Sequence, residues 1–171
     1  MSKNIFVYSN TPLWDVHYAE AIEIANEEHI KGNKVYFYQC RGELIGCPSN
    51  SFQDQKECKK CIEISNNVIK KILNFVEVVN FNFDNISAPK EIKEKYFSSV
   101  QELCNFHYDG FPIGGLVTSE IAGNNRDAFF DTKLNALRIN SLLVNGFNLY
   151  ASTLKIIQSK RLDSVYAWAV S

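Results

Sequence analysis

Four of the five cysteines lie close together, at positions 40, 47, 58 and 61, with the spacing C-x6-C-x10-C-x2-C. Four thiolates form the ligand set of a closed tetrahedral zinc site, and a C-x2-C pair is the knuckle that such sites use. The same ligands also hold iron–sulfur clusters, but the usual ferredoxin spacings are missing. Two disulfides, or unliganded thiols, are the remaining interpretations. The pattern therefore predicts a metal site with zinc preferred over iron–sulfur, and its ligands are Cys40, Cys47, Cys58 and Cys61.

A site closed by four sulfurs leaves no position for water or substrate, so the predicted zinc is structural rather than catalytic. The Cys58–Cys61 pair opens a helix-like run, and a helix N-terminus favours thiolate over thiol. The fifth cysteine, Cys104, lies far away on a predicted helix. We expect Cys104 to be a buried apolar thiol.

The elements that must position these cysteines follow a strand–helix–strand order. We predict a strand over 3–8, a helix over 12–31 that ends at Gly32, and a strand over 34–40. This order predicts a right-handed crossover and a parallel sheet. The cysteine loop then lies beyond the carboxyl end of the second strand, where sites form in α/β folds.

The rest of the chain continues the alternation of helices and strands. After the cysteine loop we predict a helix over 61–73, a strand over 76–81, helices over 89–105, 116–122 and 127–159, and a final strand over 164–170. Leu134 is a candidate core residue, and Asn145–Gly146 is a point where the long helix weakens or bends. The final strand is too apolar for an exposed edge. The fold class is therefore α/β, a Rossmann-like, doubly wound parallel sheet with helices on both faces and a four-cysteine loop after strand two.

Length and composition set the broad class. At 171 residues we expect a single α/β domain over 1–171. A formal charge of −1 gives no electrostatic reason to expect a nucleic-acid partner. No apolar run approaches the ~18 residues of a transmembrane segment, and the N-terminus lacks a signal-peptide pattern. We expect a cytoplasmic protein, with a peripheral position at the inner face of the membrane as an option, and reduced thiols disfavour the disulfide interpretation.

The sequence resembles the N-terminal domain of GT-B-type glycosyltransferases of bacterial capsular and surface-polysaccharide biosynthesis. The most specific part of the match is the cysteine cluster with its Gly42-Glu43-Leu44 segment. The other matching pieces are Thr11-Pro12, Lys31-Gly32-Asn33-Lys34-Val35, Gly114-Gly115 with Thr118-Ser119, and Leu162-Asp163-Ser164-Val165. The match covers essentially the whole chain but only half of a glycosyltransferase, because similar proteins continue into a second Rossmann-like domain that binds the donor.

The resemblance implies an acceptor-side half whose C-terminal donor domain is absent from this chain. Transfer then requires a donor-binding domain or partner chain, and the acceptor is a glycan or lipid-linked glycan. Four residues take implied roles: His17 as a general base towards an acceptor hydroxyl, with Thr11, Trp14 and Arg126 as substrate contacts. His17 and Trp14 also fit a surface or packing role. The alternative is a non-enzymatic zinc-binding α/β protein or glycan interaction module.

Overall fold

The computed structural model describes residues 2–9, 12–13, 15–44, 47, 50, 54–83 and 86–167. The chain forms two compact units. We call Met1–Asn82 with Thr153–Ser171 the sheet unit, and Phe83–Ser152 the helical unit. The single domain over 1–171 stays a prediction.

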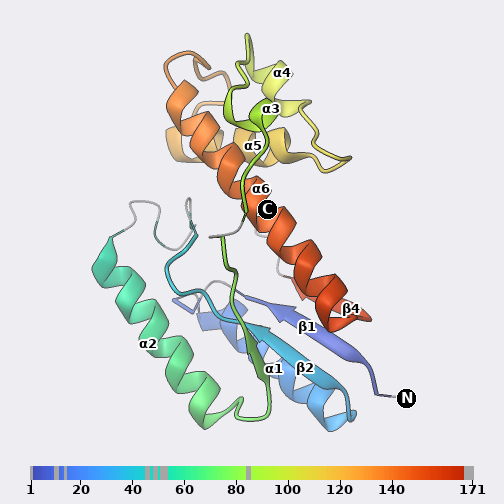
Figure 1. Cartoon of the computed structure of the whole chain (residues 1–171). Coiled ribbons are helices and arrows are strands. Elements are labelled where there is room, and N and C mark those ends of the chain that lie inside the picture. The colour runs from blue at the N-terminus through green and yellow to red at the C-terminus, as the bar shows by residue number, and fades with distance from the viewer. Residues whose placement is uncertain are drawn as a thin grey trace. The chain divides into compact units, whose positions relative to one another are not determined.

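The sheet unit contains a four-stranded parallel sheet (Figure 1). Its strands are β1 (Asn4–Tyr8), β2 (Lys34–Tyr38), β3 (Glu77–Val79) and β4 (Ser164–Ala167), in the order β3-β2-β1-β4. Ile5 of β1 pairs with Val35 of β2 on one side and with Ser164 of β4 on the other. The predicted α/β fold with a parallel sheet is confirmed.

Six helices connect or follow the described strands. They are α1 (Asp15–Ile30), α2 (Gln55–Lys71), α3 (Lys90–Lys93), α4 (Val100–Cys104), α5 (Ile113–Asn125) and α6 (Ala136–Lys160). The helices α1 and α2 belong to the sheet unit, whereas α3, α4 and α5 belong to the helical unit. Helix α6 begins in the helical unit and ends in the sheet unit.

One face of the sheet is covered by α1 and α2. Strand residues alternate between faces, so Val7 and Phe37 point to the same side, where they join a buried cluster with Tyr18 and Ala25 of α1. Val68 of α2 packs against the same cluster. The Tyr18 hydroxyl donates a hydrogen bond to Ser65 Oγ of α2 (3.1 Å), which ties the two helices together.

The other face of the sheet is aromatic. Phe6, Tyr36 and Tyr38 are buried there, and the Tyr38 ring stacks on Tyr8 with 4.8 Å between centroids. The end of α6 covers part of this face, because Lys160 Nζ lies 5.3 Å from the centre of the Tyr36 ring. Helices therefore flank the sheet on both faces, as the sequence predicts.

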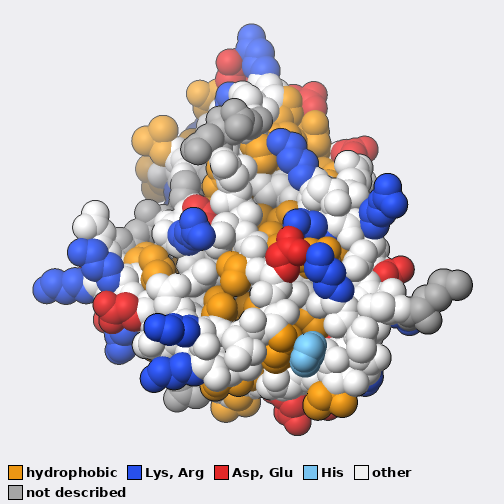
Figure 2. Space-filling view, turned by 60° about the horizontal axis from the view of Figure 1, so that its bottom comes forward, with side chains coloured by type: hydrophobic (Ala, Val, Ile, Leu, Met, Phe, Trp, Pro, Cys, Tyr) orange, Lys and Arg blue, Asp and Glu red, His pale blue; other side chains and the backbone are white. Residues whose placement is uncertain are grey.

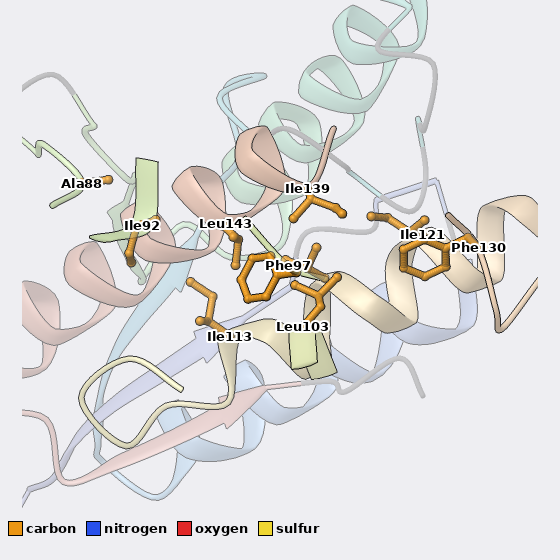
Figure 3. Close-up of a cluster of buried hydrophobic side chains, with 10 residues drawn as sticks. Ala88, Ile92, Phe97, Leu103, Ile113, Ile121, Phe130, Ile139 and Leu143 are labelled. Atoms are coloured by element: carbon orange, nitrogen blue, oxygen red, sulfur yellow. The ribbon is translucent and has the colours of Figure 1, made fainter. Parts of the chain in front are cut away.

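The helical unit has its own core, drawn in Figure 3. Side chains from α4, α5 and α6 point toward one another there, together with residues of the 88–97 and 130 segments. The buried members are Ala88, Ile92, Phe97, Leu103, Ile113, Val117, Ile121, Phe130, Ile139 and Leu143. The unit is thus stabilised by helix packing rather than by a sheet.

The predicted helices over 89–105 and 127–159 differ from the structure because side chains compete with the backbone for hydrogen bonds. The predicted helix over 89–105 is two short helices, since Ser99 caps α4 by accepting a hydrogen bond from Glu102 N (3.2 Å). The predicted helix over 127–159 begins only at Ala136. Before it, Asp127 Oδ1 accepts from Phe129 N and Asp131 Oδ1 accepts from Lys133 N, as aspartates do in turns.

Four further expectations can be compared with the structure. Gly32 adopts the left-handed conformation (φ 79°) expected after α1. Helix α6 runs unbroken through Gly146, where a side chain would crowd Ile113, so the glycine serves close packing rather than a break. Leu134 is 87% exposed, not in the core. Strand β4 is the edge of the described sheet, with Val165 44% exposed, contrary to our expectation.

Charged groups are mixed on the surface. On the face in Figure 2, Lys and Arg side chains lie among Asp, Glu and hydrophobic side chains, and neither sign covers it. In the described part of the chain, no helix combines the length and the apolar character needed to cross a membrane.

Candidate metal centre

The second pair of cysteines lies at the start of α2. Asp54 is the N-cap of this helix, and its Oδ1 accepts a hydrogen bond from Lys56 N (2.7 Å). The helix therefore begins at Gln55, six residues earlier than position 61, the predicted start. Because residues three apart are neighbours on a helix surface, Cys58 and Cys61 lie side by side within the first two turns.

The first cysteine follows the carboxyl end of β2. Cys40 comes two residues after Tyr38, and Gly42 takes a left-handed conformation (φ 93°) that turns the chain back. Gly42 N donates a hydrogen bond to Cys40 Sγ (3.3 Å). The turn therefore presents a backbone N–H to the sulfur, as in the outer shell of metal thiolate sites.

A carboxylate organises the same turn. Glu43 Oε2 accepts from Arg41 N (2.5 Å) and lies 3.6 Å from Cys40 Sγ. The Tyr38 hydroxyl donates to Glu43 Oε1 (2.8 Å). Glu43 thus links the aromatic face of the sheet to the first cysteine.

Asn50 forms a further link within the cysteine loop. Its backbone N donates to Cys47 O (3.0 Å), and its side-chain Nδ2 donates to Cys58 Sγ (3.1 Å). Asn50 therefore connects the second cysteine of the sequence with the third. Sequence reasoning did not single out Asn50, and it named Glu43 only as part of the Gly42-Glu43-Leu44 segment, without a role. The only available signal was their position among the cysteines.

All four cysteines of the cluster line one small cavity in the sheet unit. Its volume is about 20 Å³, and Leu13, Leu44 and Ile62 also line it. A space of this size holds about one water-sized particle. An adjacent, wider cleft of about 390 Å³ is lined by Cys47, Cys58, Arg41 and Lys59 among others.

The ligand set fits zinc, but the side chains do not form a finished site. Among the described residues, no three His, Cys, Asp or Glu side chains are arranged so that they could hold a metal ion as they stand. The predicted four-cysteine metal group is therefore not shown. What favours it is the shared cavity, the two N–H donors to sulfur and the soft thiolate ligands that zinc prefers.

The surroundings of the cluster disfavour four bare thiolates. Burial first, and then the negative charge of Cys40, Cys47 and Cys58, together raise the pKa of Cys61 to about 12. Burial also raises the pKa of Cys40. These raised pKa values favour the protonated thiols of Cys40 and Cys61, whereas a bound divalent cation deprotonates a coordinating thiol outright. Metal binding here would therefore release protons.

The other predicted site residues are placed as follows. Thr11 and Trp14 lie outside the described residues. His17 is in the first turn of α1, where its Nδ1 lies 3.8 Å from Glu20 Oε2 and its side chain is 34% exposed. Arg126 belongs to the helical unit, where it is the left-handed C-cap of α5 (φ 52°). The structure thus gathers the four cysteines around one cavity, and the roles of His17 and Arg126 stay predictions.

In the helical unit, the prediction for Cys104 can be judged and the packing of one glycine can be described. Cys104 is exposed, so the prediction of a buried thiol is wrong; it lines an open groove of about 600 Å³. Gly114 is buried, and a Cβ there would meet the backbone oxygens of Leu103 and Phe106. Tight packing therefore explains this glycine.

Comparison with protein-family models, with curated proteins and with solved structures found no match.

Proposed function

We propose that this chain is a zinc-stabilised α/β protein that acts as the acceptor-side half of a glycosyltransferase in bacterial surface-polysaccharide biosynthesis. The observation that carries the zinc part is the cavity of about 20 Å³ that Cys40, Cys47, Cys58 and Cys61 share. The transferase part rests on the sequence resemblance and on the parallel sheet that such a half requires.

Zinc would act as a structural cross-link. It would join three segments of the chain through their cysteines. Cys40 follows β2, Cys58 and Cys61 lie at the start of α2, and Cys47 lies in the segment between them. A zinc ion with four thiolates is closed to substrate, and its binding free energy becomes folding free energy. The metal would therefore shape the carboxyl edge of the sheet, where ligands of α/β folds bind.

In the proposed reaction the chain holds the acceptor. His17 would take the proton of an acceptor hydroxyl, Thr11 and Trp14 would contact the glycan, and Arg126 would meet an anionic lipid-phosphate portion. Donor binding would come from a second half, in the same protein or in a partner chain. The chain alone would then bind acceptor without transferring sugar.

Metal analysis tests the zinc site. We expect one zinc per chain in colourless protein, lost in Cys58→Ser together with a lower melting temperature. Cys104→Ser is the matched control, because Cys104 is exposed in the helical unit, and it should keep both values. Brown protein with visible absorption would indicate an iron–sulfur cluster instead, and metal-free wild-type protein that melts at the same temperature as Cys58→Ser would reject the site.

Glycan binding tests the acceptor role. On an array of bacterial surface oligosaccharides we expect the zinc-loaded chain to bind a restricted set, with binding weakened in Trp14→Ala. With a donor-binding half and nucleotide sugar added, His17→Ala should then lower transfer without lowering acceptor binding. Binding without transfer under any such condition would favour the non-enzymatic glycan module, and zinc-loaded chain that binds no glycan would reject the acceptor role.

A further inference from the structure

Asn50 forms hydrogen bonds to Cys47, Asp54 and Cys58. Its side-chain amide forms two hydrogen bonds with the backbone of Asp54. Oδ1 accepts from Asp54 N (2.8 Å), and Nδ2 donates to Asp54 O (2.8 Å). Asp54 is in turn the N-cap of α2. Asn50 therefore fixes the point at which the helix that carries Cys58 and Cys61 begins.

The same amide also reaches a sulfur. Nδ2 lies 3.1 Å from Cys58 Sγ, within hydrogen-bond distance for sulfur, and the backbone N of Asn50 donates to Cys47 O (3.0 Å). One residue thus holds the backbone of one cysteine and the side chain of another. Gly42 N donates in the same way to Cys40 Sγ (3.3 Å). One cysteine after β2 and one cysteine of α2 therefore each accept a hydrogen bond from an N–H group.

We infer that Asn50 is a positioning residue of the metal centre, which orients Cys58 and donates a hydrogen bond to its thiolate. This inference rests on the proposed zinc site. A donor at a metal-bound sulfur offsets part of its negative charge and fixes its direction, and outer-shell partners of this kind typically change metal affinity by roughly 10- to 100-fold.

Two substitutions separate the contact with sulfur from the contact with the loop. Asn50→Asp keeps an oxygen that can accept from Asp54 N, but it removes the N–H donor and places a carboxylate beside Cys58. Asn50→Ala removes both. If the sulfur contact matters, Asn50→Asp should weaken zinc binding at least as much as Asn50→Ala; if only the loop contact matters, Asn50→Asp should be the milder change.

The experiment measures zinc affinity by competition with a chromogenic chelator, and the thiolate-to-metal charge-transfer absorption of the cobalt-loaded protein. We expect roughly 10- to 100-fold weaker zinc binding in both variants, and a shifted cobalt spectrum in Asn50→Asp. Asn135→Ala is the matched control, since Asn135 Nδ2 also donates to a backbone carbonyl four residues away (Asp131 O, 2.8 Å) but lies in the helical unit.

The outcomes distinguish this inference from the proposed function. Wild-type protein that binds neither zinc nor cobalt would reject the metal site itself. Wild-type protein with one tightly bound zinc, and Asn50 variants with the same affinity and cobalt spectrum, would reject only the role of Asn50. An Asn50→Asp variant milder than Asn50→Ala would also reject it, because the loop contact would then explain the effect.

Discussion

The two compact units are stabilised in different ways, and among the described residues the four clustered cysteines line one cavity of the sheet unit. In the sheet unit, parallel strands with buried faces bring Cys40 to the same edge as the start of α2. In the helical unit, short helices pack around an apolar core and leave Cys104 exposed. The difference shows that the end of a strand and the start of a helix bring cysteines together at one end of the sheet. Cys104, on a helix of the other unit, lies apart from that cluster.

The comparison predicts that zinc stabilises the sheet unit alone. Phe37→Ala and Leu143→Ala each remove a fully buried side chain, one from each core, and we expect each to cost about 3–5 kcal/mol of unfolding free energy. Because a ligand stabilises only the structure that binds it, excess zinc should raise the unfolding midpoint of Phe37→Ala by protecting the sheet unit. Hydrogen exchange resolved by segment, with and without zinc, measures this.

The Leu143→Ala variant is the internal control of that experiment. Zinc should leave the exchange of its helical-unit amides unchanged. Equal protection of both units by zinc would show that they unfold together, and the distinction between them would fail.

Substitution of Gly114 should destabilise the helical unit instead of the sheet unit. A Cβ in Gly114→Ala would clash with Leu103 O and lie 2.9 Å from Phe106 O, both of which are backbone atoms that cannot move aside cheaply. We expect a loss of about 3 kcal/mol, at the upper end for overpacking, without loss of zinc. Denaturant melts and metal analysis measure the two quantities.

Gly123→Ala provides the matched control for Gly114. Gly123 lies in the same helix α5, and a Cβ there meets nothing within 4 Å. Since alanine is favoured over glycine in a helix by roughly 0.5–1 kcal/mol, this variant should be slightly more stable. Equal effects at the two positions would contradict the close packing of Gly114.

A smaller, pH-dependent effect is expected at the edge of the sheet unit. Lys160, and then Lys34, hold the pKa of Glu77 below its usual range, and Lys34 Nζ lies 2.8 Å from Glu77 Oε2. A lowered pKa adds stability that is present above the ordinary carboxyl pKa of about 4.3 and is lost as the pH falls through the folded value. Glu77→Gln should therefore cost under about 1 kcal/mol at neutral pH, because the pair is partly exposed.

The pH profile decides whether Glu77 acts in this way. The difference between wild type and Glu77→Gln should shrink as the pH is lowered below about 4, as measured by urea melts across pH. A difference that stays constant over that range would show that the lost contacts are not ionic.

The smallest effect is expected at Leu134. The structure leaves this side chain 87% exposed, so Leu134→Ser should change stability by no more than about 0.5 kcal/mol. Leu143→Ala serves as the buried comparison in the same unit. A loss of several kcal/mol of unfolding free energy in Leu134→Ser would instead indicate that Leu134 is a core residue, as the helical pattern predicts.

Sequence patterns alone predicted the strand–helix–strand order, the parallel sheet and the place of the cysteine loop. They succeeded because buried strands and capped helices have local signatures, such as the apolar run before Tyr8 and the left-handed Gly32 after α1. They failed where one local preference competes with another. The helical pattern around Leu134 yields to Asp131, which accepts backbone hydrogen bonds and delays the helix.

The sequence by itself determined the four cysteines and their spacing, and thiolate chemistry is the reason that they were predicted to be metal ligands. Only the tertiary structure could place them around one cavity, because Cys40 and Cys61 reach it through β2 and α2. Only the tertiary structure could reveal the amide of Asn50 at Cys58. Hydrogen bonds to a sulfur depend on where a loop folds back, and no spacing of residue types encodes that position.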